Sequence, residues 1–322
     1  MPRIAIVQHA PVFLDRSATV AKAVAAIDEV AAQGAELVVF PEAFIPGYPA
    51  WIWRLRPGAD GALAQALYAR LFANAVSLAG DDLLPLREAA KRRSITVVCG
   101  INERAAEASR STLYNTVVVI GRDGSLLNRH RKLMPTNPER MLWGFGDATG
   151  LKVVDTPCGR LGTLTCWESY MPLARYALYA QGIEIYIAPT YDNGDGWIGT
   201  LRHIAREARC WVLGSGFALR GSDIPDTFPE KKTLYPDPAE WINQGDSVVV
   251  APDGALAAGP MRGEQGILYA DIDLARIALA RRTLDVAGHY ARPDIFRLHV
   301  NAQAMLPAEF ATSGQPADSG AA

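Results

Sequence analysis

The chain has 322 residues, of which 49% are hydrophobic and 20% charged, and its formal net charge is -2. This composition is typical of a globular protein long enough to bury a large core. The near-neutral charge gives no support for nucleic-acid binding, and no apolar run approaches the ~18 residues of a membrane span. The scattered cysteines (Cys99, Cys158, Cys166 and Cys210) lack C-x-x-C spacing. We therefore expect no disulfide scaffold, no zinc site and a cytoplasmic location.

The first hundred residues alternate between strand and helix patterns. RIAIVQHA begins at residue 3 and is typical of a strand rather than a signal peptide. Val/Ile runs without polar interruption indicate an α/β fold whose strands are buried on both faces. The predicted elements are strands at 4–8, 36–42 and 95–101 and helices at 18–33, 63–79 and 82–93.

The rest of the chain mixes hairpins with further alternation. One β-hairpin is predicted around Asp123-Gly124, and a second hairpin-like pair around Pro157-Cys158-Gly159. Residues 220–245 are rich in Pro, Asp and Lys and predict a functional or interfacial loop. We expect one domain over 1–302 and a disordered tail over 303–322. The later predicted elements are helices at 170–181 and 197–209 and strands at 183–189, 211–216, from about 246 and at 265–273.

The segment GTLTCWESYMPLAR places Cys166 between a short strand (162–165) and a helix start. Ser169 can cap that helix, and Pro172 is tolerated in its first turn. A helix start favours a thiolate and offers backbone N–H groups to a developing oxyanion. Cys166 is therefore a candidate nucleophile, although a buried cysteine taken alone is usually a small core residue.

Two other polar residues follow apolar strands. Glu42 comes after LVVFP, and Lys132 comes after the strand that leads into NRHRK. Ligands of open α/β proteins bind outside the carboxyl ends of strands, so Glu42, Lys132 and Cys166 can converge in one pocket. Taken singly, the glutamate can cap a helix or pair with an arginine, and the lysine can be a solvated charge. If they are buried, they should pair with each other, because an unpaired buried charge costs several kcal/mol.

These motifs, VVFPEAF, HRKLMPT and LTCWES, resemble those of the nitrilase superfamily of carbon–nitrogen hydrolases. The resemblance covers about residues 3–300 and implies a four-layer α-β-β-α sandwich, an α/β fold. It also implies that Glu42, Lys132 and Cys166 form the catalytic triad and that Glu139 is the family's second glutamate. RHRKLMPTNPERMLWGFGD, GIEIYIAPT and AGHYARPDIF resemble the nitrilase branch. Amidase and carbamoylase branches usually carry an aromatic residue and Asp after the cysteine, where this chain has Trp167 and Glu168.

The resemblance implies a chemistry for each residue. Cys166 would attack a small-molecule nitrile, Glu42 would transfer protons, and Lys132 with the backbone N–H of Trp167 would stabilise the developing charge. Glu139 would orient Lys132 or assist the base, and no metal or organic cofactor is expected. Alternatives are an amidase or a nitrile or cyanide hydratase with the same triad, or an inactive filament-forming scaffold. Related nitrilases imply a homo-oligomer, either a dimer or a larger spiral.

The aromatic residues Tyr48, Trp51 and Trp53 of FIPGYPAWIW follow Glu42 in a Gly/Pro-rich loop. They are candidates to line the substrate pocket. Alternatively, they pack the loop or face another subunit. His130 is expected to make a structural hydrogen bond, and Glu168 to pair with Arg175 or Lys132.

Overall fold

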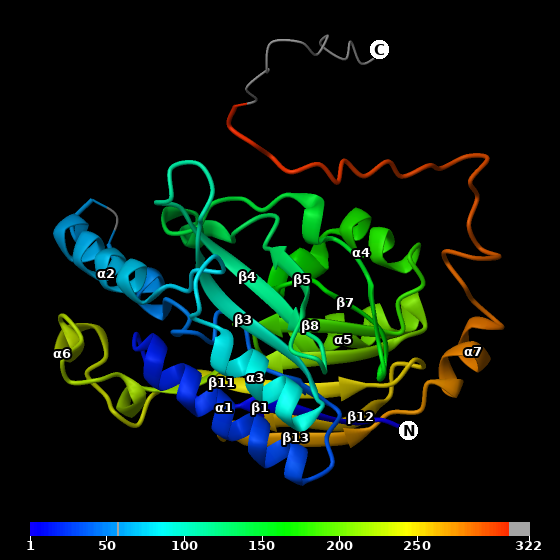
Figure 1. The fold of residues 1–322 in the computed structure, drawn as a ribbon, viewed down its shortest axis with the longest axis horizontal. Coiled ribbons are helices and arrows are strands. Elements are labelled where there is room, and N and C mark those ends of the chain that lie inside the picture. Colours follow the sequence, from blue (N-terminus) through cyan, green and yellow to red (C-terminus); the bar gives the residue numbers. More distant parts are fainter. Residues whose placement is uncertain (57, 309–322) are drawn as a thin grey trace.

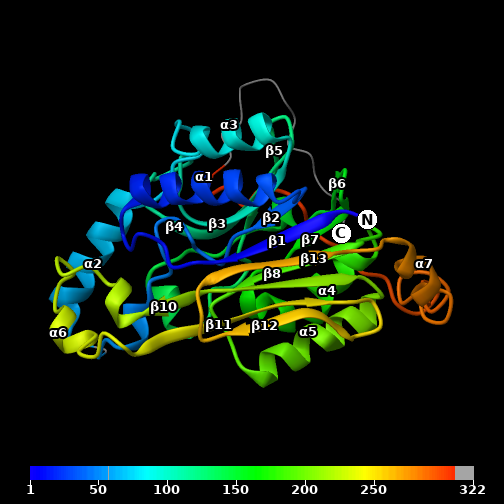
Figure 2. The same ribbon diagram turned by 90° about the horizontal axis from the view of Figure 1, so that it is seen from below.

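The chain folds into two stacked β-sheets with helices on both outer faces, as Figure 1 and Figure 2 show. The computed structural model describes residues 1–56 and 58–308. Of the tail predicted to be disordered (303–322), residues 309–322 lie outside the described residues, and 303–308 form no helix or strand. Within the described part of the chain, no helix combines the length and apolar character needed to cross a membrane.

The first sheet has the strand order β13-β1-β2-β3-β4-β5. Strands β1, β2 and β3 are parallel to one another, and the other pairings are antiparallel. The hairpin predicted around Asp123-Gly124 is confirmed as β4 and β5. The bounds are β1 (Arg3–Gln8), β2 (Leu37–Val39), β3 (Thr96–Arg104), β4 (Leu113–Ile120), β5 (Leu126–Arg131) and β13 (Gly266–Asp271).

The second sheet has the order β10-β11-β9-β8-β7-β6, with β12 paired to β11. Strands β7, β8 and β9 are parallel, and the predicted second hairpin is confirmed as the antiparallel pair β6 and β7. The bounds are β6 (Val154–Thr156), β7 (Gly159–Thr163), β8 (Ile185–Thr190), β9 (Trp211–Gly216), β10 (Ala218–Arg220), β11 (Trp241–Val250) and β12 (Leu256–Arg262).

The helices cover the outer faces and the ends of the two sheets. Helices α1 and α3 lie over the first sheet, α4 and α5 over the second, α2 and α6 at one end and α7 at the other (Figure 2). The α-helices are α1 (Arg16–Ala32), α2 (Gly61–Asn74), α3 (Leu84–Arg93), α4 (Pro172–Tyr179), α5 (Asp195–Ala208), α6 (Lys231–Leu234) and α7 (Ala275–Arg281). The short 3-10 helices are η1 (Ala50–Trp53), η2 (Asn137–Met141), η3 (Ala148–Gly150), η4 (Cys166–Tyr170) and η5 (Gly221–Asp223).

Strand β1 shows why the sheets stack in layers. Successive side chains of a strand point to opposite faces. Ala5 and Val7 pack under the helices that cover the first sheet, whereas Ile4 and Ile6 pack between the two sheets. A third apolar cluster joins the second sheet to α4 and α5. The predicted four-layer α-β-β-α sandwich is therefore confirmed.

The strand predicted over 36–42 is shorter than expected and ends at Val39. The chain then turns, and Ala43 has a positive φ of 50°. This turn packs against Gly100 of β3, where an added Cβ would lie only 2.2 Å from the Pro41 carbonyl oxygen. The close approach of the two backbones at Gly100 fixes the position of Glu42.

The prediction that 220–245 is an irregular loop is wrong in part, and the functional or interfacial role expected for it stays a prediction. The segment contains η5 and α6 as well as parts of β10 and β11. Its Phe228 and Tyr235 are buried in a cluster that also holds Phe13 and Trp51. The Trp51 and Phe228 ring centroids lie 5.9 Å apart. The buried aromatic residues of this segment therefore pack against the aromatic loop that follows Glu42.

Candidate active site

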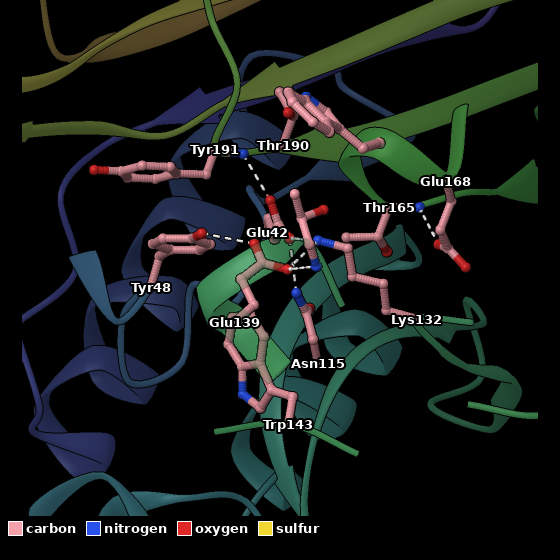
Figure 3. Close-up of polar contacts among 12 residues, drawn as sticks. Glu42, Tyr48, Asn115, Lys132, Glu139, Trp143, Thr165, Glu168, Thr190 and Tyr191 are labelled. Carbon is pink, nitrogen blue, oxygen red and sulfur yellow. Dashed lines mark hydrogen bonds and ion pairs between the residues drawn. The ribbon is translucent and has the colours of Figure 1, made fainter. Parts of the chain in front are cut away.

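The carboxylate of Glu42 is fully buried and accepts three hydrogen bonds (Figure 3). Its Oε1 accepts from Asn115 Nδ2 at 2.7 Å and from Lys132 Nζ at 2.8 Å, and its Oε2 accepts from the Tyr191 N–H at 2.7 Å. A carboxylate has about four lone-pair positions. One position on Oε2 therefore remains for a proton transfer.

Lys132 lies between two glutamates. Its Nζ donates to Glu42 and, at 2.8 Å, to Oε2 of Glu139, and all three side chains are at most 1% exposed. The main chain of the lysine is held as well, since its N–H donates to the Asn115 carbonyl and its own carbonyl accepts from Gly146. The predicted mutual pairing of Glu42 and Lys132 is confirmed.

Glu139 connects Lys132 to the aromatic loop. Its Oε2 accepts from the Thr136 N–H at 2.7 Å, which fixes it at the start of η2. Its Oε1 accepts from the Tyr48 hydroxyl at 2.6 Å. Trp53 in turn donates its indole N–H to the Tyr48 oxygen at 3.0 Å. The second glutamate is therefore anchored from three sides.

Cys166 is the first residue of η4 and lies at a sharp turn after β7. Its φ is +54°, a value that few residues other than glycine adopt. The helix predicted over 170–181 is α4, which starts later than expected, at Pro172, and ends at Tyr179; η4 precedes it. The cap predicted for Ser169 is wrong: its hydroxyl is hydrogen-bonded to Tyr186 Oη at 3.0 Å.

Glu168 joins the cysteine segment to the lysine segment. Its carboxylate accepts the Thr165 N–H and the Leu133 N–H, each at 2.6 Å, and contacts His130 Nε2 at 3.1 Å. Burial disfavours its charge, but His130 and the two N–H groups outweigh burial and lower the pKa of Glu168. The partners predicted for it were wrong, because Lys132 binds other carboxylates and Arg175 binds Glu207. The structural role expected for His130 is confirmed.

A cavity of about 250 Å³ opens beside Cys166. Four aromatic residues and five smaller or polar residues, Cys166 among them, form its walls. The lining residues are Tyr48, Trp53, Thr136, Glu139, Cys166, Trp167, Tyr191, Asp192 and Asn193. A wider surface depression of about 650 Å³ beside Arg129 and Arg131 contains none of the predicted site residues. The smaller cavity is therefore the candidate substrate site.

The predicted pocket aromatics divide into two groups. Tyr48 and Trp53 line the cavity, with Trp53 46% exposed. Trp51 does not line it: it is fully buried and packs edge-on against Phe13, with centroids 5.8 Å apart. Trp51 points the other way because it sits in η1, where successive side chains face different sides.

Trp167 contributes both its backbone and its ring. Among the described residues, no carbonyl or side-chain oxygen accepts its backbone N–H. Its indole N–H donates to Asp192 Oδ2 at 2.8 Å. The free N–H is positioned one residue after the thiol, as the oxyanion prediction requires.

Burial and neighbouring charges set the resting protonation of the site. Burial raises the pKa of the Cys166 thiol, and the charge of Glu42 raises it further against the opposing effect of Lys132. Burial also raises the pKa of Glu42. For Lys132, burial works against the charge, but the surrounding anionic groups prevail and raise its pKa. These directions favour a neutral thiol over a thiolate at Cys166, opposite to the effect of a helix start, and therefore call for a base.

Two residues of the site were missed by sequence reasoning. Asn115 lies near the start of β4 and reaches Glu42, which follows β2, across the intervening strand β3 of the same sheet. Tyr191 follows β8 and stacks its ring on Tyr48, with centroids 3.8 Å apart and planes 4° apart. The polar Asn115 within the apolar run LYNTVVVI was a usable signal, whereas nothing local marks the Tyr191 backbone N–H.

The profile of the family described as "Carbon-nitrogen hydrolase" matches residues 3–282. An aliphatic nitrilase of Sinorhizobium fredii is 42% identical over 300 residues, which cover 93% of this chain and 95% of that protein. A bifunctional nitrilase/nitrile hydratase of Nicotiana tabacum is 40% identical over 98% of this chain and 91% of its own. The fold is similar to that of a Saccharomyces cerevisiae member of branch 10 of the nitrilase superfamily. That similarity has a TM-score of 0.66 at 20% identity and covers 90% of this chain and 96% of the yeast chain.

Proposed function

This chain belongs to the carbon–nitrogen hydrolase family, and we propose that it is a nitrilase that converts a nitrile into a carboxylic acid and ammonia. One observation carries the proposal. The buried Lys132 binds both Glu42 and Glu139, and a cavity lined by Glu139 exposes Cys166 beside them. Nitrilases of about 40% identity over nearly the whole chain support the choice of nitriles among the family's substrates.

The first half of the proposed reaction forms a covalent intermediate. Glu42 takes the proton of the Cys166 thiol through its free Oε2 position, and the sulfur forms a bond to the nitrile carbon. The proton passes to the nitrogen, which gives a thioimidate. The third N–H of Lys132 and the N–H of Trp167 stabilise the developing negative charge.

The second half of the reaction consumes two water molecules. Glu42 takes a proton from the first water, whose oxygen adds to the thioimidate carbon, and the proton goes to nitrogen. The carbon–nitrogen bond breaks and ammonia leaves, which gives a thioester. The second water then displaces the sulfur, releases the carboxylic acid and restores the thiol.

Addition of the first water to the thioimidate carbon gives a tetrahedral species, and a second product can form from it. If the carbon–sulfur bond breaks instead of the carbon–nitrogen bond, an amide is released. The similarity to a bifunctional nitrilase/nitrile hydratase of Nicotiana tabacum favours this branch as a minor route. Protonation makes ammonia the better leaving group, so proton delivery to the nitrogen decides between the two products.

The decisive experiment supplies the enzyme with nitriles and their matching amides. Ammonia, acid and amide are measured together across aromatic, arylaliphatic and aliphatic compounds. We expect acid and ammonia in equal amounts from nitriles, with some amide. Hydrolysis of amides without any nitrile turnover would favour the amidase alternative, and no turnover of either would favour the inactive scaffold.

We also propose that the enzyme is a cytoplasmic homo-oligomer. The aromatic loop after Glu42 and residues 220–245 pack on each other within one chain. The support for an oligomer is an apolar surface on η4 and α4, where Trp167, Tyr170 and Leu173 are 51%, 48% and 67% exposed. Light scattering over a concentration series, with activity measured in parallel, tests this proposal, and a fully active monomer would contradict it.

A further inference from the structure

The hydrogen bond from Tyr191 to Glu42 joins the two sheets at the reacting groups. Glu42 follows β2 of the first sheet, whereas Tyr191 follows β8 of the second (Figure 3). Cys166 also comes from the second sheet, after β7. The Tyr191 N–H, at 2.7 Å from Glu42 Oε2, is therefore a direct link from the nucleophile's sheet to the carboxylate of the other sheet.

The sheet itself does not hold Tyr191. The parallel ladder between β8 and β9 ends at the pair Thr190 and Gly216. Beyond the end of this ladder, the side chain of Asn243 in β11 binds the backbone of Tyr191. Its Nδ2 donates to the Tyr191 carbonyl, and its Oδ1 accepts the Gly245 N–H at 2.9 Å. With 2% of its surface exposed, the amide is fixed by both of its polar atoms.

The same strand holds the far end of the loop. Asp246 of β11 accepts the Gly194 N–H through Oδ2 at 2.6 Å. Between these two anchors lies Asp192, which binds the Trp167 indole. Strand β11 therefore clamps residues 191–194, and this segment both donates to Glu42 and forms a wall of the cavity.

We infer that Asn243 is a positioning residue that aims the Glu42 carboxylate at Cys166 by fixing the Tyr191 peptide. This inference rests on the proposed role of Glu42 as the base. The geometry of a reacting pair is sensitive, since a displacement of about 1 Å can lower a rate by about 100-fold. Asn243 does not line the cavity, so its loss should affect kcat rather than KM.

The test compares Asn243→Leu and Asn243→Asp with a matched control. Asn243→Asp keeps the size and the acceptor for Gly245 but removes the donor to Tyr191. The control is Asn128→Leu, because Asn128 is also buried (4% exposed) and donates to one carbonyl, that of Gly150, at 3.0 Å. The melting temperature, kcat, KM and the pH profile of kcat/KM are measured for each variant.

We expect both Asn243 variants to lose at least about 10-fold in kcat with KM changed by less than about threefold. The acidic limb of kcat/KM should move to higher pH, because a lost N–H donor disfavours the charged form of Glu42. The charged or titratable groups that face Glu42 are Lys132, Glu139, Cys166, Tyr48 and Tyr191, and Asn243→Leu leaves all of them unchanged. The control should lower the melting temperature without moving this limb.

Wild-type kcat and an unmoved limb in a folded Asn243 variant would overturn the inference, as would the same changes in Asn128→Leu. If Asn243→Leu does not fold, Asn243→Asp decides through kcat and KM alone, because its added carboxylate can move the acidic limb by itself. The wild-type enzyme tests the proposed function separately. If that function is wrong, the wild-type enzyme does not hydrolyse nitriles. Amides are assayed in parallel, so the Asn243 comparison is made on whichever substrate is turned over.

Discussion

Basic residues in β5 and directly after it belong to two ionic clusters that differ in charge balance and in burial. The first, the arginine cluster, consists of Glu103, Glu107, Arg129 and Arg131. It has as many guanidinium groups as carboxylates. Its Glu107 and Arg129 side chains are 46% and 30% exposed, and Arg131 lies over the Tyr114 ring at 3.7 Å. This cluster is balanced in charge and partly hydrated.

The second, the lysine cluster, consists of Glu42, Lys132 and Glu139. One ammonium serves two carboxylates, and none of the side chains is more than 1% exposed. A buried carboxylate without full compensation resists ionisation, and the pKa of Glu42 is raised by burial. In the arginine cluster the opposite holds: hydrogen bonds from Arg129 and Arg131 lower the pKa of Glu107 to about 2.

The comparison shows that residue type does not decide what a buried charge does. The consecutive residues Arg131 and Lys132 enter different clusters. In the arginine cluster, the numbers of positive and negative groups are equal and water reaches some of them, so the ion pairs form a stabilising network. Where the charges do not match and water is excluded, as around Glu42, burial raises the pKa of the carboxyl group, which suits the proton transfer that we propose. We therefore expect changes in the lysine cluster to affect turnover and changes in the arginine cluster to affect stability.

The largest effect is expected at the thiol that faces the lysine cluster. Cys166→Ala should fold normally and show no detectable turnover, because no other group can form the covalent intermediate. Steady-state rates and circular dichroism check this prediction. A folded variant that kept more than about 1% of the wild-type rate would exclude covalent catalysis through Cys166.

Changes within the lysine cluster should come next. Glu42→Gln and Lys132→Met should each lower kcat by at least about 100-fold, the scale of lost acid–base or electrostatic assistance. Glu107→Gln, the control from the arginine cluster, should stay within about twofold of wild type. Equal losses in all three variants, or mild losses in the first two, would remove the distinction between the clusters.

The reactivity of Cys166 should report the charges of the lysine cluster with opposite signs. The Glu42 charge raises the thiol pKa and the Lys132 charge lowers it. Glu42→Gln should therefore shift the rate–pH profile of iodoacetamide alkylation to lower pH, and Lys132→Met should shift it to higher pH. The alkylation rate of Cys166→Ala is subtracted, because it measures the reaction of the other three cysteines. Identical profiles in all variants would show that these charges do not act on the thiol.

The smallest effect is expected from the arginine cluster at changing pH. The folded pKa of Glu107 is depressed from 4.5 to about 2, so its ion pairs contribute stability above pH 4.5. Because the side chain is partly exposed, Glu107→Gln should cost only about 0.5 kcal/mol near pH 7. This difference from wild type should shrink as pH falls below 4.5 towards 2. Thermal melts from pH 7 to pH 3 check it, and a difference that grew on acidification would contradict the assignment.

Local sequence determined most elements of the fold. Apolar runs such as those of β1 and β3 have few alternatives to a buried strand, and the Asp123-Gly124 turn indicated its hairpin directly. Predictions failed where a distant contact overrode the local pattern. The strand through Glu42 ends early because its chain turns onto Gly100, and residues 220–245 are ordered by aromatic packing on Trp51.

The sequence by itself determined which side chains we propose as catalytic, because Glu42, Lys132 and Cys166 each follow a strand in recognisable motifs. Only the tertiary structure decided the orientation and the protonation of these groups. Asn115 and the Tyr191 N–H reach Glu42 from other strands, and Trp51 turns away from the cavity while Tyr48 and Trp53 line it. The physical reason is that protonation and orientation depend on burial and on contacts between residues far apart in the chain. Local residue patterns record neither.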